Sequence, residues 1–129
     1  MDARLAAISI GGRAFADLVV QLRLLGCTAQ SSCSTREHPH AWLEFGVEPD
    51  GGSEHPRVIS LFLQPARDPQ LLTLDIVQPG RRVSQLFAPR QLSRAMLVDR
   101  VCGLHRRWAG AAATPPPSSW DVPFSELAA

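Results

Sequence analysis

The chain has no lysine, no tyrosine and no asparagine among its 129 residues. Without asparagine it has no acceptor for N-linked glycosylation. The codons of all three missing amino acids are rich in A and T, so we interpret their absence as the mark of a high-GC gene. The same codon bias explains why arginine, with 13 copies, is the only strong base. The arginines are therefore weak evidence that guanidinium chemistry was selected over that of lysine.

Net charge and long apolar runs are also scarce. The formal net charge is +1, which gives little attraction to nucleic acid or acidic lipid. No run approaches the roughly 20 apolar residues of a membrane helix. The first ten residues hold the acid Asp2 and a single base, which is a poor match to a signal peptide. Three cysteines, an odd number, suit reduced thiols better than a disulfide framework. We therefore expect an intracellular protein, cytoplasmic or nuclear, that is not secreted and does not enter a membrane.

Three apolar runs occupy the middle of the chain, at residues 42–48, 57–63 and 71–77. Each has the length and the β-branched or aromatic content of a strand. The two connections between them contain glycine or proline and are too short for a helical crossover. The sequence therefore predicts a three-stranded antiparallel meander.

Side chains alternate between the two faces of a strand, and the predicted faces differ in polarity. One face is wholly apolar: Leu43, Phe45, Val47, Ile59, Leu61, Leu63, Leu72, Leu74 and Ile76. The other is mixed, with Trp42, Glu44, Val58, Phe62, Leu71, Thr73, Asp75 and Val77. This contrast is typical of a sheet that is covered on one side only, so we expect Leu61 and Leu74 to be fully buried.

One helix is expected before the meander in the chain and a second helix after it. Apolar residues recur at helical spacing over residues 13–25, after a break at Gly11 and Gly12 and before a stop at Gly26. Pro89 suits the start of a second helix that runs to about Trp108. Residues 1–10 fit either a helix or a strand, residues 27–39 a polar loop, and residues 83–88 a short extra strand.

The predicted fold is an α+β two-layer sandwich with the order helix, three-stranded antiparallel meander, helix, followed by an extended C-terminal tail. Residues 1–110 form a single domain in this interpretation, and residues 111–129 form a Pro-rich linker and an apolar tail.

The element order resembles that of the double-stranded RNA-binding domain, and secretion-type chaperones have a similar order. His55 lies between the first two predicted strands, as that RNA-binding family requires. However, residues 89–92 read Pro-Arg-Gln-Leu, where the family carries a basic cluster. Element order alone is an analogy of fold, so it assigns no family.

Metal and acid–base chemistry find little support. Cys27, Cys33, His38 and His40 occur in one stretch, but their spacing differs from that of a standard zinc site. Cys102, one helical turn from His105, is expected in the core. The chain has no nucleophile, phosphate-loop or dinucleotide motif, and nothing in it predicts a pocket that would shift the pKa of a carboxylate. We predict no metal, no cofactor and no enzymatic activity.

The tail carries Trp120, Phe124 and Leu127 after its Pro-rich spacer. These side chains either dock on the domain or form a short linear motif for another protein. With Trp42, Phe62 and Val77 of the mixed sheet face, they predict a protein-binding module that acts as an adaptor, inhibitor or complex subunit. The same residues could instead bind a second copy of the chain and form a homodimer. The alternative is a nucleic-acid-binding module that uses the arginines of the second helix: Arg90, Arg94, Arg106 and Arg107.

Overall fold

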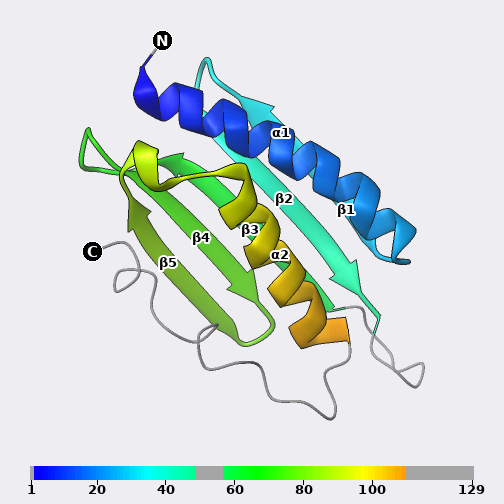
Figure 1. The fold of residues 1–129 in the computed structure, drawn as a ribbon. Coiled ribbons are helices and arrows are strands. Elements are labelled where there is room, and N and C mark those ends of the chain that lie inside the picture. The colour runs from blue at the N-terminus through cyan, green and yellow to red at the C-terminus, as the bar shows by residue number, and fades with distance from the viewer. Residues whose placement is uncertain (1, 49–56, 110–129) are drawn as a thin grey trace.

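The computed structural model describes residues 2–48 and 57–109. This part of the chain is an α+β fold with two α-helices and one antiparallel sheet. Its elements in chain order are α1 (Ala3–Leu24), β1 (Thr28–Ser34), β2 (His40–Val47), β3 (Arg57–Pro65), β4 (Leu72–Gln78), β5 (Arg81–Phe87), the 3-10 turn η1 (Pro89–Gln91) and α2 (Arg94–Ala109). The strands lie side by side in sequence order, and both helices lie on one face of the sheet (Figure 1).

The described sheet has five strands, so the prediction of three was too few. The polar loop expected at residues 27–39 contains β1, which pairs with β2 along its whole length. Of the β1 side chains, only Ala29 is buried. Such an edge strand can be polar throughout, because pairing with its neighbour outweighs its weak strand propensity. The extra strand considered for residues 83–88 is present as β5, where Gln85 and Phe87 are buried.

Helix α1 begins ten residues earlier than predicted and runs straight through Gly11 and Gly12. These glycines do not break the helix, because they sit where α1 comes closest to its neighbours. A Cβ atom on Gly11 would lie 2.8 Å from Cδ2 of Leu63, and one on Gly12 would lie 2.3 Å from Sγ of Cys33. The missing side chains therefore allow the close approach of helix and sheet.

The two ends of α1 are capped by different groups. The carboxylate of Asp2 accepts a hydrogen bond from the backbone N–H of Arg4 at 2.7 Å, as at many helix N-termini. Gly26 follows the other end with φ +89°, and the N–H of Cys27 donates to the carbonyl of Leu22 at 3.0 Å. This is the Schellman arrangement, so the predicted stop at Gly26 is confirmed.

The second helix starts at Arg94, later than predicted, because Pro89 opens the separate turn η1. Leu92 follows in an extended, buried conformation, and Ser93 accepts a hydrogen bond from the N–H of Met96 at 3.1 Å. In α2 itself, Leu97, Val101 and Leu104 share one buried stripe.

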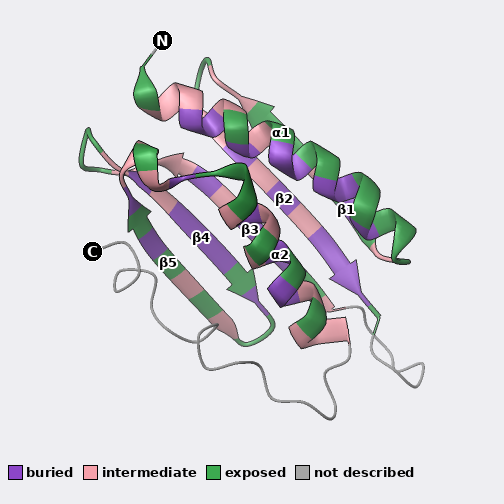
Figure 2. Ribbon diagram, viewed as in Figure 1, coloured by how far each residue is buried: buried purple, intermediate pink, exposed green. Residues whose placement is uncertain are grey.

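The core lies between the helices and the sheet (Figure 2). Leu61 and Leu74 are fully buried, as predicted, and so are Leu43, Ile59 and Leu63. From the helices, Ile8, Phe15, Leu97 and Val101 pack into the same cluster. The predicted apolar face is therefore confirmed as the inner face of the sheet. The connection 49–56 and the tail 111–129 lie outside the described residues.

Candidate functional site

The face of the sheet opposite the helices, here called the outer face, is the first candidate surface. Its side chains come from every strand: Gln30, Ser32, His40, Trp42, Glu44, Val58, Ser60, Phe62, Thr73, Asp75, Val77, Arg82, Ser84 and Leu86. Within residues 2–48 and 57–109, no helix covers it (Figure 1). The mixed face predicted from the sequence is thus the face that the helices leave open.

An aromatic group lies at the centre of the outer face. Trp42 on β2 stands opposite Phe62 on β3, and both are half-buried. The ring of His40 stacks on Phe62, with 5.5 Å between centroids and 7° between planes. His40 Nδ1 lies 2.8 Å from the carbonyl oxygen of His38 and donates to it. His40 Nε2 then accepts from the hydroxyl of Ser32 at 3.3 Å. These bonds hold the imidazole flat on the apolar surface.

Aliphatic side chains flank the aromatic group. Val58 is 46% exposed, Val77 is 44% exposed and Leu86 is 49% exposed. They come from β3, β4 and β5, so the apolar character extends across these neighbouring strands. Trp42, Phe62 and Val77, predicted as contact residues, therefore lie on one continuous face.

The polar groups of the outer face bond mainly to one another. Glu44 accepts from the amide of Gln30 at 3.3 Å and from the hydroxyl of Ser60 at 3.5 Å. Asp75 accepts from the hydroxyl of Ser84 and lies 3.6 Å from Nη2 of Arg82. Asp75 is only 8% exposed, so this acid of the mixed face is shielded from solvent. Groups that already have partners cost less to desolvate when another surface covers them.

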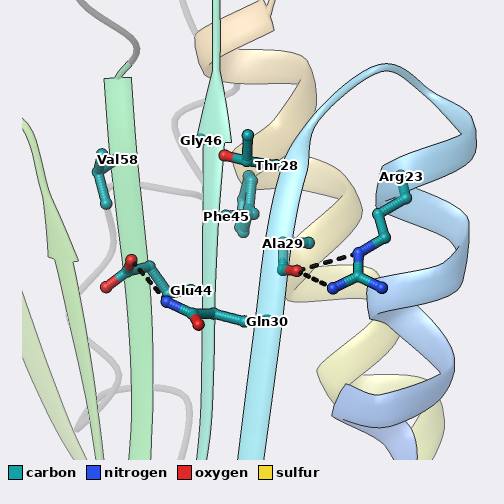
Figure 3. A pocket seen from close by; sticks show the side chains of 8 residues that line it. All are labelled: Arg23, Thr28, Ala29, Gln30, Glu44, Phe45, Gly46 and Val58. Carbon is teal, nitrogen blue, oxygen red and sulfur yellow. Dashed lines mark hydrogen bonds between the residues drawn. The ribbon is translucent and has the colours of Figure 1, made fainter.

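A hollow of about 230 Å³ lies at one end of the outer face, where Gly46 has no side chain (Figure 3). Thr28, Gln30, Glu44 and Val58 are among the residues that line it. Arg23 reaches it from α1 and donates to the carbonyl of Ala29 from Nε at 3.1 Å and from Nη2 at 2.8 Å. The guanidinium therefore occupies a backbone acceptor of the edge strand β1, which hinders pairing with a further strand.

A second hollow, of about 220 Å³, lies between the two helices and is here called the helix groove. It is lined by Leu18, Gln21, Leu22, Leu25, Val101, Cys102, His105 and Arg106. Burial lowers the pKa of His105, because the charged imidazolium is poorly solvated there. The sequence analysis missed this groove, because its residues come from two stripes that only the packing of α1 against α2 brings together.

The four arginines predicted to bind nucleic acid do not form one surface. Arg90 lies on η1, outside α2. Arg94 forms an ion pair with Asp17 of α1. Arg106 is exposed, and Arg107 lies over the ring of Trp108 at 5.4 Å. At about 100° per residue, Arg94 and Arg106 point roughly 120° apart around the helix.

The sulfur and imidazole groups considered for metal are separated. Cys33 pairs with Ala41 on the inner face, and its thiol donates to the carbonyl of Ile8, whereas His40 lies on the outer face. Burial raises the pKa of the Cys27 and Cys33 thiols, which disfavours the thiolate that binds metal. No three His, Cys, Asp or Glu side chains of the described ranges gather as metal ligands. The absence of metal stays a prediction. The prediction that Cys102 lies in the core was wrong, because Cys102 is exposed.

Helix α1 is long and apolar enough to cross a membrane by length and composition alone, although the sequence analysis expected no such segment. Half of its most apolar window is buried inside the protein, as in a core helix. The tail residues Trp120, Phe124 and Leu127 lie outside the described residues.

The chain matches no family model. Searches of the curated proteins and of the solved structures find no match either. The surfaces described above are therefore the basis for proposing a function.

Proposed function

We propose that the protein is a non-catalytic protein-binding module, an adaptor, inhibitor or complex subunit, whose outer face contacts its partner. The observation that carries this proposal is the apolar character of that face. Trp42 and Phe62 share this face with the exposed Val58, Val77 and Leu86, and no helix covers them in the described residues. Exposed apolar patches of this kind commonly mark contact surfaces, and aromatic side chains are enriched at such surfaces.

The polar groups of the outer face also favour a protein partner. Glu44 and Asp75 are hydrogen-bonded to neighbours on the same face. A partner can therefore cover the face without leaving a buried charge without partners, which is the costly case in an interface. A nucleic acid would instead meet the carboxylates of Glu44 and Asp75, the second of which lies beside the guanidinium of Arg82. A second copy of the chain or a different intracellular protein fits this description.

The experiment is a pull-down from a lysate of the source cells, after nuclease treatment, at low and at high salt. The bait is the whole chain, the double variant Val58→Lys/Val77→Glu, or the control variant Val20→Glu/Leu24→Lys. Both variants replace two exposed apolar residues by one base and one acid, so the net charge is unchanged. The control changes α1 only.

The wild-type chain and the control variant should retain the same specific protein at both salt concentrations. The outer-face variant should lose that protein while keeping its melting temperature. Equal retention by the outer-face variant would contradict the proposal. A homodimer would appear in sedimentation as a dimer of the wild type and the control but a monomer of the outer-face variant.

The alternative is a nucleic-acid-binding module that uses the exposed Arg90 and Arg106. Electrostatic binding of this kind weakens steeply as salt rises. Retention of nucleic acid that is lost at high salt, and lost in an Arg90→Gln/Arg106→Gln variant, would favour it over the outer-face proposal.

A further inference from the structure

We infer that residues 119–127 of the same chain dock in the helix groove between α1 and α2. This inference does not depend on the proposed function, because it concerns the opposite side of the molecule from the outer face. It draws on three observations: the apolar lining of the groove, the charges at its rim, and the length of chain that follows α2.

The groove needs an apolar occupant of limited size. Leu18, Leu22 and Val101 form its floor, and Leu25 at its margin is 63% exposed. Its volume of about 220 Å³ is below the roughly 300–1,000 Å³ of small-molecule sites. It suits a large side chain, and an aromatic ring is the side chain that buries most apolar area, about 150–250 Å². The segment 119–127 offers Trp120 and Phe124.

Charge complementarity favours this occupant. The rim of the groove carries the exposed Arg106, and none of the described residues that line the groove is an acid. Residues 111–129 contain two acids, Asp121 and Glu126, and no base. The hollow of the outer face, by contrast, holds the carboxylate of Glu44, and its guanidinium, that of Arg23, already binds the carbonyl of Ala29. An acidic apolar segment therefore fits the helix groove better than the outer face.

The chain is long enough to place the segment there within one molecule. Helix α2 ends at Ala109, about 12 Å beyond Val101 at 1.5 Å per residue. Residues 110–119 can span on the order of 16–19 Å as a flexible chain. A connection of this length keeps the segment at a high effective concentration near the groove. Docking within one molecule is therefore favoured over docking on a second copy.

The thiol of Cys102 reports on the groove, since it lines the groove and is exposed. The experiment measures alkylation of each cysteine by iodoacetamide, with mass spectrometry of the whole chain after short exposures. Cys33 on β1, whose thiol lies against α1 and does not line the groove, is the internal reference. We compare the wild type with Trp120→Ala/Phe124→Ala, which removes the aromatic anchors, and with Asp121→Lys/Glu126→Lys, which reverses the charge. A control variant, Thr114→Lys/Ser118→Lys, adds two bases to the linker but keeps both acids.

Removing the anchors should raise the alkylation rate of Cys102 relative to Cys33 by roughly threefold or more, the change expected if the segment covers the groove about two thirds of the time. Reversing the charge should act in the same direction, and the linker control should not. The ratio should not change on about tenfold dilution of the protein. Equal rates in wild type and anchor variant would overturn the inference, and so would protection that disappears on dilution. Retention of a partner by the outer face is measured separately, so either proposal can fail alone.

Discussion

Trp108 fastens the C-terminal end of α2 to the sheet. Its indole Nε1–H donates to Oε1 of the buried Gln78 at 3.1 Å. Arg57 of β3 donates to the backbone carbonyl of Trp108 at 3.1 Å, and its guanidinium lies over the indole ring at 5.5 Å. Trp108 therefore has a structural role here, although beside Arg106 and Arg107 its sequence context also fits a stacking platform for bases.

Replacing Gln78 by leucine tests this role. The variant keeps a buried side chain of similar size but removes the acceptor of the Trp108 N–H. Loss of one partner from a buried hydrogen bond costs about 1–3 kcal/mol, so we expect the unfolding free energy in urea to fall by that amount. Gln70→Leu in the exposed turn after β3 is the control, and it should change the free energy by less than about 0.5 kcal/mol. Equal effects of the two changes would show that the contact contributes nothing.

The imidazole of His105 makes stability depend on pH. Its pKa in the folded protein is lowered from 6.5 by burial. Below that pH the unfolded chain therefore takes up a proton that the folded chain resists, and stability is lost as pH falls. The variant His105→Gln should lose less unfolding free energy than the wild type between about pH 7 and about pH 5. Parallel pH profiles of the two proteins would contradict this.

At the scale of elements, the close packing of α1 on the sheet decides the shape of the inner layer. Gly11 and Gly12 let the helix approach Leu63 on β3 and Cys33 on β1. Near the C-terminal end of α1, Arg23 binds the carbonyl of Ala29 on the same edge strand. The long helix therefore contacts β1 at its middle and near its C-terminal end.

The variant Gly12→Ala separates packing from helix propensity. At an exposed helical position, alanine in place of glycine would stabilise by about 1 kcal/mol. Here the new Cβ would meet Cys33, and overpacking costs about 1–3 kcal/mol. We expect a net loss of unfolding free energy in denaturant titrations. The control variant Ala16→Gly, at an exposed position on the same helix, measures the effect of helix propensity alone. A stabilised Gly12→Ala protein would show that the helix sits farther from the sheet.

Sequence patterns revealed those elements whose burial alternates strongly. In the middle of β2, β3 and β4 every second residue is apolar and buried, so Leu43, Leu61 and Leu74 could be placed on the inner face correctly. Strand β1 could not be recognised, because only Ala29 among its residues is buried. Gly11 and Gly12 suggested a break, because a sequence does not show which surface a glycine faces.

The candidate surfaces were predictable to different degrees. Trp42, Phe62 and Val77 were placed on one face by counting alternate residues along single strands, and this needs no knowledge of packing. The stacking of His40 on Phe62 and the burial of Asp75 could not be predicted, since both depend on strand register. The helix groove joins residues about 80 apart in sequence, Leu22 and Cys102 among them, and only the tertiary fold defines it.

At the scale of the whole molecule, the two sides of the sheet differ. The inner face and both helices form the core, and the helix groove lies on that side. The outer face, with Trp42 and Phe62 at its centre, is proposed to bind the partner. The three tryptophans mark three different places: Trp42 the outer face, Trp108 the joint between α2 and the sheet, and Trp120 the C-terminal segment.

The most direct test of the outer-face proposal is ¹⁹F NMR of the whole chain labelled with 5-fluorotryptophan. Its three resonances are assigned from the single variants Trp42→Phe, Trp108→Phe and Trp120→Phe. The partner retained in the pull-down is then added in increasing amounts. We expect the Trp42 resonance to shift or broaden as the partner binds, while the Trp108 resonance stays in place. Binding that moves the Trp108 resonance and leaves the Trp42 resonance unchanged would contradict this expectation.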